Sequence, residues 1–172
     1  MYRLLRYDLP VHFLLLFTNW LPDIVKVLRF RGWLVSPFLG SCGKGLKLGR
    51  NITLYNPQNI HFGNDVYIAY GCWFTASEQI LICDEVLIGP YCVFASSNHT
   101  RLDGSYRHGE RQRGKIEIGR GSWIGSHSCI LQDTTVGTGS LVAANSVVNK
   151  ALPNDVISGG TPAKVLKEII DE

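Results

Sequence analysis

The sequence predicts an all-β fold in which short parallel strands wind into a three-sided prism. From Leu48 to about residue 153, apolar residues return every six positions. This period fits neither an α-helix nor a stack of hairpins, and it is typical of coiled repeat folds. The chain also contains 18 glycines and only 18% charged residues, which favours short strands and tight turns. At 172 residues, we expect one domain with a sizeable core.

Each six-residue unit opens with an apolar residue that we expect to point into the prism. These residues are Leu48, Leu54, Phe62, Ile68, Phe74, Ile82, Ile88, Phe94, Ile118, Ile124, Ile130, Val136, Val142 and Val148. The fifth position is usually small or β-branched, as at Cys72, because the chain turns a corner there. Glycine at the second position, as at Gly89 and Gly125, relieves crowding at the same corner. Two-residue spacers at Ile60–His61 and Ile80–Leu81 lengthen one side of a coil without changing the buried face.

The cysteines predict reduced thiols in a cytoplasmic protein. Their number is odd, they lack a CxxC spacing, and no signal peptide precedes them. The five are Cys42, Cys72, Cys83, Cys92 and Cys129. Because Cys72 and Cys92 occupy the same place on successive coils, we expect them to stack as small interior residues rather than to act as nucleophiles.

Residues 1–40 predict two short helices before the prism. Val11–Leu21 is nearly all apolar, but it is only about half the ~20 residues that a membrane span requires. Asp23–Leu34 is amphipathic and basic. Its apolar face holds Ile24, Val27, Leu28 and Leu34, and its interspersed cations are Lys26, Arg29 and Arg31. Two interpretations stay open: the helices pack on the prism or on a neighbouring subunit, or residues 1–35 make a peripheral membrane contact.

The six-residue period stops at "ASSNHTRLDGS" (Ala95–Ser105), which predicts a loop over about residues 100–115 that leaves the prism. From His99 to Lys115, five cations face two acidic residues, a net charge of +3. They are Arg101, Arg107, Arg111, Arg113 and Lys115, against Asp103 and Glu110. This segment is either a solvated loop or a basic rim for an anionic ligand. The whole chain's charge of +3 is too small to indicate nucleic-acid binding.

The repeats resemble the hexapeptide-repeat acyltransferases, whose fold is a left-handed parallel β-helix. From Phe62 to Ile170 the sequence is similar to the maltose/galactoside and surface-polysaccharide O-acetyltransferases. This similarity rests on Asn98–His99, "IEIGRGSWIGSHSCIL" from residue 116 and "VAANSVVNKALPNDVISGGTPAKVLKEI" from residue 142. The expected architecture is a β-helix domain over residues 41–160, then a segment 161–172 with a short C-terminal helix. The resemblance implies acetyl-CoA as co-substrate, a sugar or glycan acceptor, and a homotrimer with active sites between subunits.

The same resemblance assigns roles to individual residues. His99 matches the catalytic histidine, and the amide of Ser126, beside Gly125, is our candidate oxyanion donor. The positions that match the coenzyme A cleft are Gly89, Trp123, Ser126, Ala144, Asn149, Lys150, Lys164 and Lys167. The candidate acceptor contacts are Asn98, Arg101, Asp103 and Ala69. Ala69 stands where the galactoside enzymes place an Asn toward the sugar, so the resemblance does not specify a galactoside or maltose acceptor.

These residues favour an acetyl-CoA-dependent O-acetyltransferase with His99 as general base. A neutral imidazole, with a pKa near ~6.5, takes the proton of a hydroxyl as it attacks, and such catalysis typically contributes about 10²–10⁴-fold. We expect the acceptor to be a surface-polysaccharide or lipid-linked precursor at the inner membrane face. The alternatives are N-acetylation of an amino sugar, acetylation of a xenobiotic or antibiotic, and a non-catalytic trimeric scaffold. A metal site is not expected, because only His99 and His127 fall near the cleft.

Overall fold

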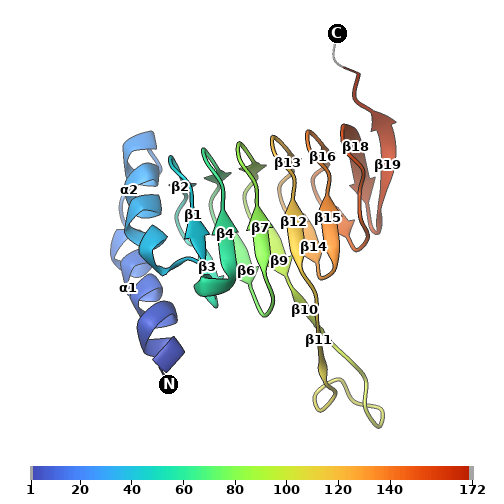
Figure 1. Ribbon diagram of the computed structural model, residues 1–172, viewed down its shortest axis with the longest axis horizontal. Coiled ribbons are helices and arrows are strands. Elements are labelled where there is room, and N and C mark those ends of the chain that lie inside the picture. Colours follow the sequence, from blue (N-terminus) through green and yellow to red (C-terminus); the bar gives the residue numbers. More distant parts are fainter. Residues whose placement is uncertain (1, 171–172) are drawn as a thin grey trace.

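The computed structural model describes residues 2–170 as a stack of coils with a helical cap at one end (Figure 1). The strands of successive coils pair in parallel, so that each side of the prism is one sheet. This is the prism that the six-residue period predicts. Within the described residues, no helix is long and apolar enough to cross a membrane.

The three sides of the prism are here called the first, second and third sheets. The first contains β1 (Ser41–Cys42), β4 (Ile60–Phe62), β7 (Ile80–Ile82), β12 (Ile116–Ile118) and β15 (Thr134–Val136). The second contains β2 (Lys47–Leu48), β5 (Tyr67–Ile68), β8 (Leu87–Ile88), β13 (Trp123–Ile124), β16 (Leu141–Val142), β18 (Val156–Gly160) and β19 (Ala163–Glu168). The third contains β3 (Thr53–Tyr55), β6 (Trp73–Thr75), β9 (Val93–Ala95), β14 (Cys129–Leu131) and β17 (Val147–Val148).

Strand register confirms the role of the two-residue spacers. In the early coils Ile60 pairs with Ile80, an offset of 20 residues. In the later coils Ile116 pairs with Thr134, an offset of 18 residues, or three units of six. The first sheet carries the extra pair of residues, and because side chains alternate with period two, the same face stays buried. A short 3-10 helix, η3 (Pro57–Asn59), precedes β4 on one of the longer coils.

The core lies along the prism axis and consists of the residues that open each unit. All of those that the sequence predicts to be interior are buried. Phe74 and Phe94 stack face to face with ring centroids 4.5 Å apart. At the corners, Ser122 is fully buried, and its hydroxyl donates to the carbonyl of Gly137 at 2.7 Å. A Cβ on Gly125 would lie 2.6 Å from the amide nitrogen of Ala144, so glycine is required there by close backbone approach.

The predicted N-terminal helices form and cover the first coil. They are η1 (Leu4–Asp8, a π-helix), α1 (Leu9–Thr18), α2 (Val25–Val35) and the 3-10 helix η2 (Ser36–Phe38). Helix α1 starts before the predicted range because Pro10 suits the first turn of a helix, where its missing N–H is not needed. Val11 and Leu15 face the prism and join the core. The first interpretation, packing on the prism, is therefore confirmed for the inner faces of the helices.

The buried face of α2 differs from the expected one. The sequence places Ile24, Val27, Leu28 and Leu34 on one apolar face, but the residues that the helix buries are Leu28, Arg31, Gly32 and Val35. Ile24 precedes the helix and is 55% exposed. The reason is Gly32: a Cβ there would lie 2.1 Å from the carbonyl oxygen of Leu46, so the helix backbone rests directly on the first coil. This contact rotates α2 and turns Arg31 inward.

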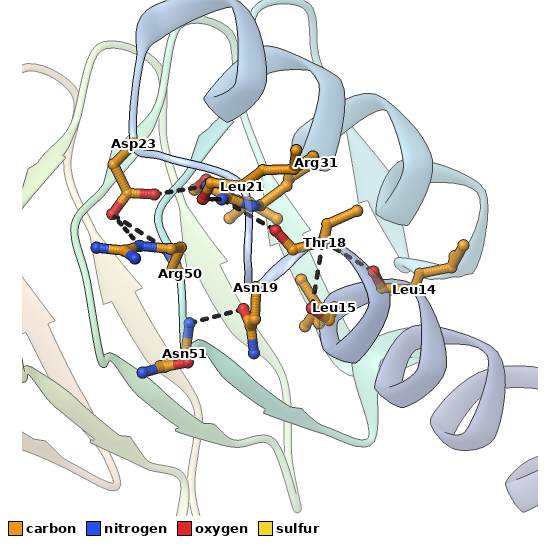
Figure 2. Close-up of polar contacts among 10 residues, drawn as sticks. Leu14, Leu15, Thr18, Asn19, Leu21, Asp23, Arg31, Arg50 and Asn51 are labelled. Carbon is orange, nitrogen blue, oxygen red and sulfur yellow. Dashed lines mark hydrogen bonds and ion pairs between the residues drawn. The ribbon is translucent and has the colours of Figure 1, made fainter.

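Arg31 joins both helices to the first coil (Figure 2). Its side chain is fully buried, and its guanidinium donates to the carbonyl oxygens of Thr18, Leu21 and Leu48 at 3.2, 2.6 and 3.3 Å. Asp23 accepts a fourth bond at 2.6 Å. A residue that the sequence pattern assigns to the surface thus links the end of α1, the connection between the helices and β2.

The predicted short C-terminal helix is wrong, because residues 163–168 form strand β19. It pairs antiparallel with β18 on the second sheet, with Gly160 opposite Ala163. Gly160 adopts φ +102°, which lets the chain reverse directly after β18. The reversal gives the last coil a backbone partner and covers a sheet edge that a helix would leave unpaired. The division of the chain at residues 40 and 160 stays a prediction.

Candidate functional site

His99 lies at the foot of a hairpin that leaves the prism. It ends β10 (Ser97–His99), which pairs antiparallel with β11 (Arg111–Arg113), and the two strands run outward together (Figure 1). The amide of Gly114 donates to the carbonyl of Ser96 at 3.1 Å and closes the base of the hairpin. The predicted loop over 100–115 is therefore anchored, and His99 is held by strand pairing rather than by a flexible connection.

A hollow of about 640 Å³ surrounds the exposed His99 side chain. It is lined by Asn98, His99, Tyr106, Arg107 and Arg111. The side-chain oxygen of Asn98 accepts a hydrogen bond from the backbone N–H of His99 at 2.9 Å, which ties the two neighbours together. The hollow presents an imidazole, an amide, a phenol and two guanidinium groups to solvent, and it is open enough to admit a sugar.

The remaining predicted acceptor contacts do not line this hollow. Arg101 and Asp103 lie further along the hairpin, and Asp103 has φ +47° in the turn where Leu102 and Ser105 pair. Ala69 lies on another edge of the prism and is buried, with its amide bonded to the carbonyl of Ile88 at 2.9 Å. Of the four predicted contacts, the structure therefore brings only Asn98 to His99.

A second group of predicted residues forms a column of corners between the second and third sheets. Gly89 lies against the turn at Ser126, where a Cβ on Gly89 would be 2.8 Å from the Ser126 nitrogen. Ala144 occupies the corresponding exposed corner of the next coil. Within residues 2–170 the Ser126 N–H has no hydrogen-bond partner, whereas the neighbouring amides of Gly125 and His127 are bonded.

The other predicted coenzyme A contacts are exposed, but not all at this column, because Asn149 and Lys150 lie at the edge between the third and first sheets. Trp123 lies on β13 with about half of its surface exposed. Asn149 and Lys150 directly follow β17, and Lys164 and Lys167 lie on β19. The three lysines form no ion pair within the described chain. The second sheet thus presents Trp123, Lys164 and Lys167, whereas Asn149 and Lys150 lie at the edge that also carries His99.

The two groups lie on different edges of one prism. His99 lies where the third sheet passes into the first, and Ser126 lies where the second passes into the third. A single chain therefore does not bring the candidate base to the candidate oxyanion donor.

Sequence analysis did not identify Tyr106, Arg107 and Arg111 as neighbours of His99. The positive charge of residues 99–115 can be read from the sequence. The cross-strand pair of His99 and Arg111 follows from the register of the hairpin, which the six-residue period does not specify. Tyr91 was also missed: its ring stacks on that of His127 with centroids 5.0 Å apart, which gives His127 a packing role.

The cysteines do not take part in this geometry. The thiols of Cys72 and Cys92 are buried and bond to the carbonyls of Gly89 and Gly125, both at 3.2 Å. The hydrogen bond with Cys92, together with burial, raises the pKa of the Cys72 thiol above its ordinary range. This confirms that they stack as interior residues.

A second cavity lies apart from all the predicted site residues. It measures about 540 Å³ and lies between α1 and β3, with Val11, Leu15 and Tyr55 in its walls. It belongs to the junction of the helical cap with the first coil. The described residues contain no group of three or more His, Cys, Asp or Glu side chains that could hold a metal ion.

Comparison with known proteins gives a consistent set of matches. The family model for the bacterial transferase hexapeptide (six repeats) matches residues 115–150. The chain is 34% identical over 114 residues to galactoside O-acetyltransferase of Escherichia coli K12, which is 66% of this chain and 56% of that relative. The chain thus spans little more than half the length of this curated relative.

Two solved structures extend the match to nearly the whole chain. One is a hexapeptide-repeat acetyltransferase of Vibrio cholerae in complex with acetyl-CoA. It is 31% identical, with a TM-score of 0.76, and the match covers 95% of this chain and 87% of that chain. The other is a maltose O-acetyltransferase of Clostridium difficile, 27% identical with a TM-score of 0.85, over 98% and 89% of the two chains. The prism therefore matches the left-handed parallel β-helix of these acetyltransferases.

Proposed function

Because this chain belongs to the hexapeptide-repeat acetyltransferase family, we propose that it transfers the acetyl group of acetyl-CoA to a hydroxyl of a sugar. The observation that carries the proposal is His99, which strand pairing holds at the rim of an open hollow beside other polar groups. The acetyl-CoA complex of the Vibrio cholerae relative supports the choice of co-substrate.

The proposed acetyl transfer requires only a general base and a hydrogen-bond donor to the oxyanion. The imidazole of His99 takes the proton of the acceptor hydroxyl while the oxygen attacks the thioester carbonyl. The tetrahedral oxyanion accepts a hydrogen bond from the Ser126 amide, which has no internal partner in the described chain. Collapse of this intermediate forms the ester and expels the thiolate of coenzyme A, which receives the proton from the imidazolium. No covalent acyl-enzyme is required, in agreement with the burial of Cys72 and Cys92.

The complete site is proposed to form between subunits of a homotrimer. His99 and the unbonded Ser126 amide lie on different edges of one prism, so His99 acts with Ser126 of the partner subunit. Coenzyme A would lie along the column of corners, with its thiol end toward His99. The residues proposed to line its path are Gly89, Trp123 and Ala144 of one chain, with Asn149 and Lys150 of the chain that supplies His99, and Lys164 and Lys167 would meet its phosphates.

The acceptor is proposed to be a surface-polysaccharide or lipid-linked precursor, met at the inner face of the cytoplasmic membrane. The outer face of the helical cap supports this location. Away from the buried residues of α1, the exposed apolar side chains are Phe13, Leu16 and Phe17 on the helix and Trp20 in the turn that follows it; they are here called the apolar stripe. Trp33 on α2 is also largely exposed and stacks on Phe30 with centroids 6.2 Å apart.

The charges of the cap suit an anionic bilayer. Four exposed cations surround the apolar stripe, and they are Arg3, Arg6, Lys26 and Arg29. The two acidic residues of the segment are engaged elsewhere: Asp8 accepts from the amide of Asn56 at 2.9 Å, and Asp23 pairs with Arg31 and Arg50. The outward charge is therefore positive, and aromatic side chains with basic neighbours are typical of interfacial contacts.

Thiol release from acetyl-CoA with a panel of sugars and amino sugars tests the reaction. We expect His99→Ala to lower kcat/KM by about 10²–10⁴-fold, whereas His108→Ala, on the same hairpin outside the hollow, keeps wild-type rates. Equal rates in wild type and His99→Ala would remove His99 from the mechanism. Absence of release with every acceptor would favour the scaffold, and an acetyl product that resists hydroxylamine would indicate N-acetylation.

Vesicle sedimentation tests the membrane contact. We expect the wild type to sediment with vesicles that contain phosphatidylglycerol and to stay in the supernatant with phosphatidylcholine alone. The triple variant Phe17→Ser, Trp20→Ser, Trp33→Ser should lose the binding, while Leu166→Ser, an exposed apolar residue of β19, should keep it. Equal partition of wild type and triple variant would overturn this location.

A further inference from the structure

We propose that the acceptor carries an anionic group, a carboxylate or a phosphate, which Arg107 and Arg111 bind beside His99. This inference rests on the proposed function, and it names the substrate class of the same site. Its starting point is the hairpin register, in which His99 and Arg111 are direct partners across the two strands. Directly opposed residues of an antiparallel pair project to the same face, with Cβ atoms about 5 Å apart. Strand pairing therefore fixes a guanidinium beside the proposed base.

Arg107 brings a second guanidinium to the same hollow from the far part of the hairpin. The lining contains Arg107 and Arg111, and it contains no acidic residue. The ion pairs of the described chain all lie elsewhere and involve Arg31, Arg50, Lys115 and Arg120. The two guanidinium groups thus face the hollow without a carboxylate partner. An anion between them would relieve their mutual repulsion and accept charge-assisted hydrogen bonds.

The acidic residues of the hairpin do not cancel this charge. Glu110 directly precedes β11, and its backbone carbonyl accepts hydrogen bonds from the amide and hydroxyl of Thr100. Asp103 lies in the turn near the tip. Neither side chain lines the hollow. In a solvated loop, acidic and basic side chains can point in any direction. A site for an anion requires the acidic side chains to point away from the hollow.

The anion is assigned to the acceptor rather than to coenzyme A. The phosphates of the co-substrate are proposed to meet Lys164 and Lys167 on β19, which belongs to the second sheet. The hairpin leaves the prism at the edge between the third and first sheets, on a different coil. The thioester end that approaches His99 carries no charge. The positive charge of Arg107 and Arg111 near His99 is therefore available to the acceptor, the molecule whose hydroxyl is acetylated.

Steady-state thiol release with neutral and anionic derivatives of one sugar tests the inference, and the neutral and phosphate derivatives carry the same hydroxyls. Methyl glucoside serves as the neutral acceptor, glucose 1-phosphate as the phosphate arm and glucuronate as the carboxylate arm, and the corresponding galactose derivatives form a second set. We expect kcat/KM to be at least about 10-fold higher for one of the anionic arms, and to fall as salt rises. The ratio of anionic to neutral kcat/KM should fall about 10-fold or more in Arg107→Gln and Arg111→Gln.

Arg113→Gln is the matched control, because Arg113 lies on the same strand, opposite Ser97 and outside the hollow. It should keep the wild-type ratio. Transfer to neutral and anionic sugars with the same kcat/KM, unchanged in the arginine variants, would overturn the inference and leave the proposed function intact. Melting temperatures of the variants check that the hairpin change does not unfold the protein.

A binding measurement separates failure of the inference from failure of the proposed function. Saturation-transfer NMR follows glucose 1-phosphate and glucuronate on the protein without acetyl-CoA. Binding in the wild type that is lost in Arg111→Gln would support the anion site even if no transfer occurred. Absence of both binding and transfer for every anionic sugar, with transfer to a neutral one, would reject the anion site alone. Absence of all binding and all transfer would reject both proposals.

Discussion

The guanidinium of Arg31 lies 2.6 Å from the carboxylate of Asp23 at the junction of the two helices with the first coil. The arginine is fully buried, while the Asp23 side chain is 28% exposed and also approaches Arg50. This pair closes the connection between α1 and α2 and turns their inner faces to β2. It therefore decides whether the cap stays on the prism.

Arg31→Ala should destabilise the protein. The change leaves the buried carbonyls of Thr18, Leu21 and Leu48 without their donor, and removal of one partner of a buried pair costs about 3–5 kcal/mol. Because Asp23 is partly exposed, we expect the lower end of this range. Urea unfolding followed by circular dichroism measures it. Arg29→Ala, exposed on the same helix, should change stability by less than about 0.5 kcal/mol, and similar losses in both variants would contradict the role of Arg31.

Gly125→Ala should also destabilise the protein, through the corner of a coil. Its Cβ would lie 2.6 Å from the amide nitrogen of Ala144, and only a backbone shift can relieve that contact. We expect a loss of about 1–3 kcal/mol in the free energy of unfolding. Gly121→Asn is the control: Gly121 has open space and φ +69°, a conformation that asparagine tolerates. A thermal melt that does not change in Gly125→Ala would contradict the close packing.

The buried thiols should resist modification in the native protein. Burial raises the pKa of Cys42, Cys83 and Cys129, and the bond to Cys92 with burial raises that of Cys72, so these four thiols form little reactive thiolate at pH 8. The bond with Cys72 lowers the pKa of Cys92, and this thiol is protected because it is fully buried. Ellman's reagent should react slowly at pH 8, faster as the pH rises further, and with all five thiols in denaturant. Rapid native reaction of all five would show that the coils open readily.

Lysines on β19 should influence binding of acetyl-CoA. We expect Lys164→Gln and Lys167→Gln each to raise the KM for acetyl-CoA about 2–5-fold, because an exposed ion pair contributes about 0.2–1 kcal/mol. The effect should shrink at high salt. Lys44→Gln, exposed near the opposite end of the prism, is the control and should have the wild-type KM. An unchanged KM for acetyl-CoA in the β19 variants would show that its phosphates bind elsewhere.

The repetitive part of the fold was predictable because every unit repeats the same requirement. Ile118 and Val142 are interior for the reason that Leu48 is: each opens a six-residue unit and points toward the axis of the prism. Arg31 was not predictable, since its burial depends on Gly32 meeting the first coil. The local sequence of residues 163–168 is compatible with a helix or a strand. They form a strand because the otherwise unpaired edge of β18 offers them backbone hydrogen bonds.

The candidate base was visible for a different reason. His99 lies where the repeat period ends, and both the period and its end can be read in the sequence. Its neighbours Arg107 and Arg111 are eight and twelve residues away in the chain; the hairpin register places Arg111 beside it, and the path of the chain beyond the paired strands brings Arg107 to the same hollow. Ser126 was chosen from resemblance, and what the structure adds is that its amide has no bond within the described chain.

Because the hairpin is closed at its base, its sequence, and with it the choice of acceptor, can change independently of the rest of the protein. The chain leaves after Ser96 and returns at Gly114, and one backbone bond of 3.1 Å joins these two points. Residues between them can change in number and kind without altering the register of β9 or β12. An exchange of this segment between proteins of the same fold would carry acceptor preference with it, while the coenzyme A column stays as it was. Replacement of this one hairpin can thus give a protein of this fold a new substrate.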